Sequence, residues 1–318
     1  MKKRIISIIL LIVTVFSVIP ASVGCAKKDD GKITVICTVF PIYDWVRNVV
    51  GESETVEVKL LVSNGADLHS YQPTADDIIA IRESEVIVRV GGEGDSFLDD
   101  ILPQCESIKD VCLMENHEIE VMETHNDSHD HSEGDGHHHI FDEHIWLSLH
   151  NAKGAVNAIC ETLCELDGEN TEKYRANSAA YTEKLSVLCD AYDEAMSKAQ
   201  NKKIVFADRF PFIYMTEEYG IEHAAAFGGC STESEASVET VIRLASRLDE
   251  WELDCIAVTE SSDKRLAEVV IGASSRKNVR ILVFDSMQSV TNADISAGKN
   301  YIGIMENNLH TLKIAVGE

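Results

Sequence analysis

Residues 32–62, KITVICTVFPIYDWVRNVVGESETVEVKLLV, carry a strand–helix–strand pattern. Residues 32–40 are β-branched and apolar, which is typical of a buried strand. Residues 41–50 place Trp45, Val46 and Val49 at helical spacing, and residues 56–62 return to a strand composition. Strands that alternate with helices pair in parallel, so this stretch predicts a parallel α/β sheet.

The same pattern continues along the chain on both sides of a long helical segment. Thr171 to Gln200 contains no Gly or Pro and predicts one helix of about 45 Å, with two shorter helices as the alternative. We therefore expect an α/β fold of two parallel-sheet domains, 32–170 and 201–318, joined by a rigid helix at 171–200. Further strands are predicted at 86–90, 203–207, 221–227, 255–259 and 279–284, and further helices from Thr74 onward and at 152–166, 238–251, 264–274 and 300–316.

The composition excludes several classes of protein. Of the 318 residues, 45% are hydrophobic, which is enough for a packed core and argues against general disorder. The net charge of −26 argues against a nucleic-acid surface, because phosphate recognition needs clustered Lys and Arg. Only the N-terminus is apolar enough to enter a bilayer, which excludes a multi-span membrane protein.

The N-terminus has the pattern of an export signal. A basic start is followed by an apolar run, small residues and then Cys25, which predicts a signal peptide at 1–24. The Gly24-Cys25 junction resembles a bacterial lipidation motif, although Ser22 stands where Leu is usual. We expect a lipid on Cys25, a short tether at 25–31 and an extracytoplasmic location at the cell membrane; a plain secretion signal or membrane anchor is the alternative.

The remaining eight cysteines do not form a zinc-ribbon or thioredoxin-type pattern, because the sequence has no Cys-x-x-Cys pair. Several lie in apolar segments, where Cys is most often a small buried hydrophobe. Cys105 and Cys112 could form a disulfide outside the membrane, and the sequence leaves this open.

Residues 117–139 differ from the rest of the chain. Histidines and acidic residues dominate here and little aliphatic spacing remains, which predicts a mobile loop. Clustered imidazoles bind zinc, copper or nickel, so the loop could capture metal loosely; a pH-titrating solubility loop is the alternative. Its histidines are His117, His125, His129, His131, His137, His138 and His139.

Four more specific metal-ligand candidates lie either just after a predicted strand or at the start of an ordered segment. His69 follows the strand at 56–62, and His144 opens the segment after the His-rich loop. Asp208 and Asp285 end the strands at 203–207 and 279–284. Ligands of parallel sheets collect beyond the carboxyl ends of strands, so the two halves are expected to present these side chains across a cleft.

Two motifs carry a family resemblance. Residues 63–74, SNGADLHSYQPT, resemble the Gly-Ala-Asp-Pro-His-Ser-Tyr-Glu-Pro-Thr signature of zinc- and manganese-binding lipoproteins of ABC importers. Residues 142–147, DEHIWL, are similar to that family's Asp-Pro-His-x-Trp-Leu motif. Residues 38–44, 259–263 and 301–309 also match, so the resemblance covers nearly the whole mature chain.

The resemblance implies two α/β domains with one buried metal ion in the cleft. His69 and His144 correspond to the family's first two ligands, Asp208 is the best match to the third, and Asp285 matches the fourth. Glu260 belongs to the matching segment 259–263. We expect it to be either a metal ligand or a hydrogen-bond acceptor that supports the ligands. The third ligand is usually His in zinc carriers and a carboxylate in manganese carriers, so Asp208 leaves the metal open.

The His-rich loop favours Zn²⁺ as the transported ligand over Mn²⁺ or iron, as does the affinity order of divalent metals. The resulting hypothesis is a monomeric, non-enzymatic binding protein that delivers zinc to an ABC transporter permease. The alternatives are a manganese carrier, a zinc hydrolase with Glu260 as base, and a surface adhesin. The hydrolase lacks a His-Glu-x-x-His motif, and the adhesin has no motif of its own.

Overall fold

The computed structural model describes residues 31–63, 65, 68–123, 141–229 and 235–318, and Lys32–Glu318 form one compact unit. The predicted signal peptide, Cys25 and most of the tether lie outside these ranges, as do His125, His129, His131, His137, His138 and His139. Within the described ranges, no helix combines the length and apolar character needed to cross a membrane.

The first half of the unit contains a parallel sheet with the strand order β2-β1-β3-β4. Helices α2 (Phe40–Val50), α3 (Ala75–Glu83) and α4 (Leu98–Ile101) belong to this half, and Thr74 caps α3 through a reciprocal pair of hydrogen bonds with Asp77. The strands are β1 (Ile33–Cys37), β2 (Val56–Leu60), β3 (Val86–Arg89) and β4 (Lys109–Cys112).

The second half repeats this arrangement with the order β6-β5-β7-β8, again all parallel. In both sheets the first strand lies between the second and the third. The strand order therefore reverses beside the first strand, and ligands of parallel sheets commonly bind at such a switch point. The strands are β5 (Lys203–Phe210), β6 (Glu222–Gly228), β7 (Cys255–Thr259) and β8 (Arg280–Phe284), and the helices are α7 (Ile213–Tyr219), α8 (Val238–Glu250), α9 (Arg265–Ala273), α10 (Asn292–Ser296) and α11 (Tyr301–Val316).

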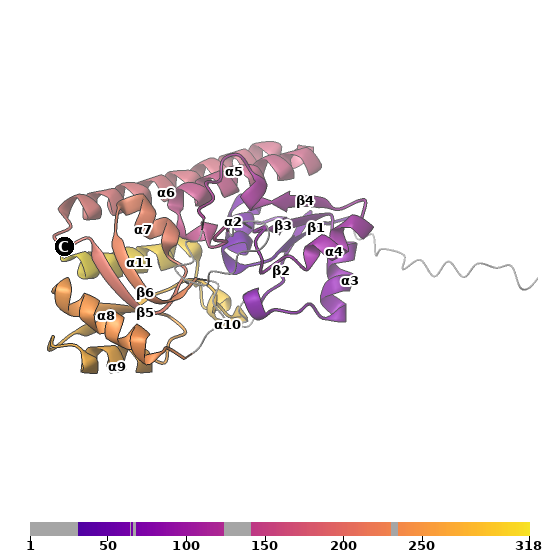
Figure 1. Cartoon of the computed structure of the whole chain (residues 1–318). Coiled ribbons are helices and arrows are strands. Elements are labelled where there is room, and N and C mark those ends of the chain that lie inside the picture. The colour runs from indigo at the N-terminus through magenta and orange to yellow at the C-terminus, as the bar shows by residue number, and fades with distance from the viewer. Residues whose placement is uncertain (1–30, 64, 66–67, 124–140, 230–234) are drawn as a thin grey trace, which may run out of the picture. The chain divides into compact units, whose positions relative to one another are not determined.

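Two long helices connect the halves. Helix α5 (Leu149–Leu166) runs beside α6 (Thr171–Lys198), which is continuous over 28 residues, as the sequence predicted. Helix α6 packs against α2 of the first half and α11 of the second, so one rigid element contacts both (Figure 1). The fold class expected from the sequence, two parallel sheets with a long joining helix, is confirmed.

Strands β4 and β5 differ from the sequence-based expectation. Strand β4 was not predicted, because KDVC is short and half polar, as edge strands often are. Strand β5 extends to Phe210, and its pairing with β6 shifts register between Phe206 and Arg209. Asp208 therefore lies inside an irregular part of β5 and not just beyond its end.

Candidate metal centre

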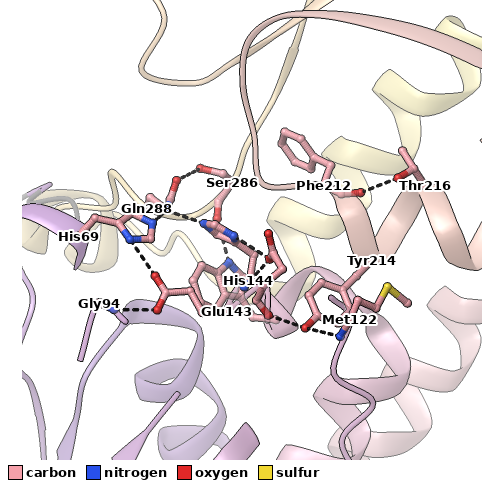
Figure 2. Close-up of polar contacts among 12 residues, drawn as sticks. His69, Gly94, Met122, Glu143, His144, Phe212, Tyr214, Thr216, Ser286 and Gln288 are labelled. Carbon is pink, nitrogen blue, oxygen red and sulfur yellow. Dashed lines mark hydrogen bonds and ion pairs between the residues drawn. The ribbon is translucent and has the colours of Figure 1, made fainter. Parts of the chain in front are cut away.

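His69 lies in a single 3-10 turn, Leu68–Ser70, which follows β2. Its Nδ1 is 2.8 Å from Oε1 of Glu143, a carboxylate that is 1% exposed. The Gly94 N–H donates to the other oxygen of Glu143 at 2.8 Å (Figure 2). Burial opposes the charged form of Glu143, but the bonds from His69 and Gly94 and the nearby imidazoles outweigh it and lower the pKa of this carboxyl. Glu143 is thus an anionic anchor for the His69 ring.

His144 is held in the same way by a carboxylate, that of Asp142, two residues earlier in the chain. Its ring is fully buried, and Nδ1 is 2.8 Å from Oδ1 of Asp142, which also accepts the His144 backbone N–H. The Tyr214 hydroxyl donates to the Asp142 carbonyl at 2.6 Å, and the Trp146 ring packs edge-on against His144. These contacts leave the imidazole little freedom to rotate.

The two rings point toward a common position. Their centroids are 5.6 Å apart, and both Nε2 atoms approach the side-chain amide of Gln288 (Figure 2). The amide nitrogen of Gln288 is 2.9 Å from Nε2 of His144 and 3.5 Å from Nε2 of His69. Because each Nδ1–H is directed to a carboxylate, each Nε2 is left with its lone pair facing the amide.

The predicted carboxylate ligands have other partners. Asp208 accepts the backbone N–H and hydroxyl of Thr259, at 3.1 and 2.8 Å. Asp285 is 2.9 Å from the ammonium of Lys299. Glu260 accepts three hydrogen bonds from the backbone and hydroxyl of Ser286 and a further one from Ser289.

Of the four predicted ligands, the structure therefore brings His69 and His144 together, and not the two carboxylates. Among the described residues, no three His, Cys, Asp or Glu side chains are close enough to hold one metal ion. His117, the one histidine of residues 117–139 that lies within the described ranges, is exposed on the surface.

Three residues at this site were not assigned a role from the sequence. Asp142 and Glu143 directly precede His144, and this adjacency was the available signal, since metal-ligating histidines usually donate their second N–H to a carboxylate. Gln288 had no such signal. It follows Met287, which has a φ of 66°. This left-handed backbone conformation is uncommon for Met, so the sequence gives no indication of it.

The chain is similar to known proteins over most of its length. A family model described as zinc-uptake complex component A, periplasmic, matches residues 35–315. The chain belongs to this family.

Individual members of the zinc-uptake family show how far the similarity extends. The zinc-binding lipoprotein AdcA of Streptococcus pneumoniae is 30% identical over 296 residues, and the match covers 92% of this chain but 58% of AdcA. The high-affinity zinc uptake system protein ZnuA of Bacillus subtilis is 26% identical, with 91% of this chain and 89% of that protein covered. The crystal structure of the Zn(II)-bound ZnuA-like domain of S. pneumoniae AdcA has 26% identity, covers 91% of this chain and all of that domain, and gives a TM-score of 0.74. The chain thus spans little more than half the length of AdcA.

Proposed function

We propose that this chain is a substrate-binding lipoprotein that captures zinc outside the cytoplasmic membrane and delivers it to an ABC importer. The observation that carries the proposal is the pair His69 and His144, whose Nδ1 atoms are fixed by buried carboxylates and whose Nε2 atoms converge. This is how proteins present imidazoles to a metal ion, because the carboxylate fixes the tautomer and makes the free nitrogen more basic.

Two imidazole nitrogens suit zinc better than manganese, which prefers oxygen ligands. The second half of the molecule would supply the remaining ligands as oxygens. Asp208 and Asp285 are the proposed carboxylates, and each would exchange its present partner, Thr259 or Lys299, for the metal. Glu260 supports the same region by holding Ser286.

The other parts of the proposal concern residues outside the site. The histidines of residues 117–139 would collect zinc loosely and raise its concentration near the site. A lipid on Cys25 would keep the protein beside its permease. The protein would act as a monomer without catalytic turnover. Its similarity to the zinc-binding and zinc-uptake proteins described above favours a zinc carrier over a hydrolase.

The test is competitive calorimetry with zinc and manganese, with elemental analysis, on the mature protein and on a variant lacking residues 117–139. We expect one tight zinc ion per chain to survive the deletion and His144→Ala to abolish it. His150→Ala is the matched control, because His150 also pairs with a carboxylate, Glu218, but its side chain is 62% exposed. Preferential manganese binding would replace zinc in the proposal, and unchanged zinc affinity in His144→Ala would exclude this site.

A further inference from the structure

Cys160 and Cys164 form a pair of neighbouring thiols on α5, the helix that follows the His144 segment. They lie one turn apart on α5, where side chains four residues apart share a face. Their sulfur atoms are 4.0 Å apart. All seven described cysteines are free thiols, so this pair is reduced in the structure.

The two thiols line a polar groove between α5 and α6, the two adjacent helices along one side of the molecule in Figure 1. The groove has a volume of about 790 Å³, and Glu161, Glu165 and Arg175 also line it. The groove therefore gives water access to the sulfur atoms and has charged side chains along the same surface.

The spacing of the sulfur atoms matches that of two thiolates on one metal ion. Zinc–sulfur bonds are about 2.3 Å long, so two sulfurs 4.0 Å apart would subtend an angle of about 120° at a shared ion. That angle lies in the range of trigonal to tetrahedral coordination. Only small side-chain rotations are needed for the pair to chelate such an ion.

The surroundings also bear on ionisation of the thiols. Burial raises the pKa of Cys160 to about 11, as does the neighbouring Cys164, while the Ser178 hydroxyl and the Arg175 charge act in the opposite direction. Cys160 is therefore protonated at neutral pH without metal. A cation that binds both sulfurs would displace one proton from each thiol, and the net charge of the pair would fall by two.

We propose that Cys160 and Cys164 form a second cation site, which binds a soft divalent ion, Zn²⁺ or Cd²⁺, through two thiolates. Water from the open groove completes the coordination. Thiolates favour soft cations more strongly than imidazole and carboxylate ligands do, so this site differs in metal preference from the histidine site.

The experiment is a Cd²⁺ titration of the purified, reduced chain under anaerobic conditions, followed by the ultraviolet sulfur-to-cadmium charge-transfer band. We expect the band to saturate with about one Cd²⁺ bound through thiolates and with release of about two protons. Cys160→Ser and Cys164→Ser should each lose most of the band. Cys105→Ser, which removes a partly exposed thiol outside α5, should retain it.

Two further measurements separate this site from the proposed zinc carrier site. His144→Ala should retain the cadmium–thiolate band, so this result does not depend on the histidine site being correct. Loss of the band on addition of excess Zn²⁺ would show that zinc binds the same two thiolates. A band that persists in excess Zn²⁺ would show that the site is selective for cadmium. A full band in Cys160→Ser/Cys164→Ser, or no band in the reduced wild-type chain, would overturn the proposal; circular dichroism confirms that the variants are folded.

Discussion

At the histidine site, the orientation of two rings depends on two buried carboxylates and one amide. Asp142 and Glu143 fix His144 and His69 from behind, and Gln288 lies in front of both. The amide N–H of Gln288 carries a partial positive charge, and the two Nε2 lone pairs face it as they would face a cation. A metal ion at this position must therefore displace or rotate the Gln288 side chain.

Gln288→Glu should raise zinc affinity by about tenfold or more, equivalent to about 1.4 kcal/mol, because it places an anionic oxygen between two neutral imidazoles. Calorimetry with a competing chelator measures this change. Gln200→Glu adds the same charge at an exposed residue and should leave zinc affinity nearly unchanged. Weaker zinc binding in Gln288→Glu would show that the ion does not occupy the position of this amide.

Asp95 offers a pH-dependent test of the packing behind the site. It is fully buried, and burial together with the charge of Glu143 raises its pKa from 3.8 to about 7, against the hydrogen bonds from the N–H groups of Val90 and Gly91. In the unfolded chain the carboxyl ionises near its ordinary pKa. Between these two pKa values the folded state binds more protons, so Asp95 makes the protein less stable as pH rises from about 4 to about 7.

Asp95→Asn should therefore gain stability relative to the wild type between pH 5 and pH 8, by at most roughly 4 kcal/mol. The Asn carbonyl oxygen can replace Oδ2, which accepts from both Val90 and Gly91 within 3.2 Å. Urea unfolding of the metal-free protein at the two pH values measures the effect. Asp76→Asn, at an exposed carboxylate, should show no comparable pH dependence, and a gain confined to pH 5 would contradict the argument.

At the scale of helices, two glycines test whether steric contact or helix propensity decides the effect of a Gly→Ala substitution on stability. Gly154 is in α5, where an added Cβ would lie 2.7 Å from the backbone oxygen of Glu118. Gly272 is in α9, where an added Cβ would meet nothing within 4 Å. Both positions have ordinary helical backbone, so only the surroundings differ.

Gly154→Ala should destabilise the protein by about 1–3 kcal/mol, because a backbone carbonyl cannot move aside and the gain in helix propensity is about 1 kcal/mol at most. Gly272→Ala should be neutral or stabilise by up to about 1 kcal/mol. Chemical denaturation of both variants gives the comparison. Equal effects would mean that the contact with Glu118 does not restrict α5.

The helices and strands also show which parts of the fold the sequence could predict. Strand β7 and the start of α6 fall at the predicted residues, because a β-branched run and a long segment without Gly or Pro are strong local signals. Strand β4 could not be predicted, since its pairing with β3 and not its composition makes it a strand. His69 and His144 were predictable from motifs, whereas Gln288 follows Met287, whose left-handed backbone conformation the sequence does not indicate.

At the scale of the whole described unit, the two halves are joined by direct contacts as well as by a connecting helix. The Trp146 indole donates to the Ser286 carbonyl at 2.9 Å, and the Tyr301 hydroxyl donates to the Trp146 carbonyl at 2.7 Å. Trp45 of α2 packs edge-on against Tyr301 of α11, with ring centroids 5.1 Å apart. One hydrophobic cluster contains residues of both halves. The boundaries 32–170, 171–200 and 201–318 remain proposed domains within this unit.

Because the core is shared, we predict a single cooperative unfolding transition for residues 32–318 and not one transition for each half. Zinc bound between the halves would stabilise only the folded state, so free zinc at about 100 times its dissociation constant should add about 2.7 kcal/mol and raise the one midpoint. Scanning calorimetry tests both points through the ratio of calorimetric to van't Hoff enthalpy, with His144→Ala as the variant that should not respond to zinc. Two resolved transitions, of which zinc shifts one, would place the metal within one half and would argue that the contacts of Trp146 and Tyr301 are too weak to couple the sheets.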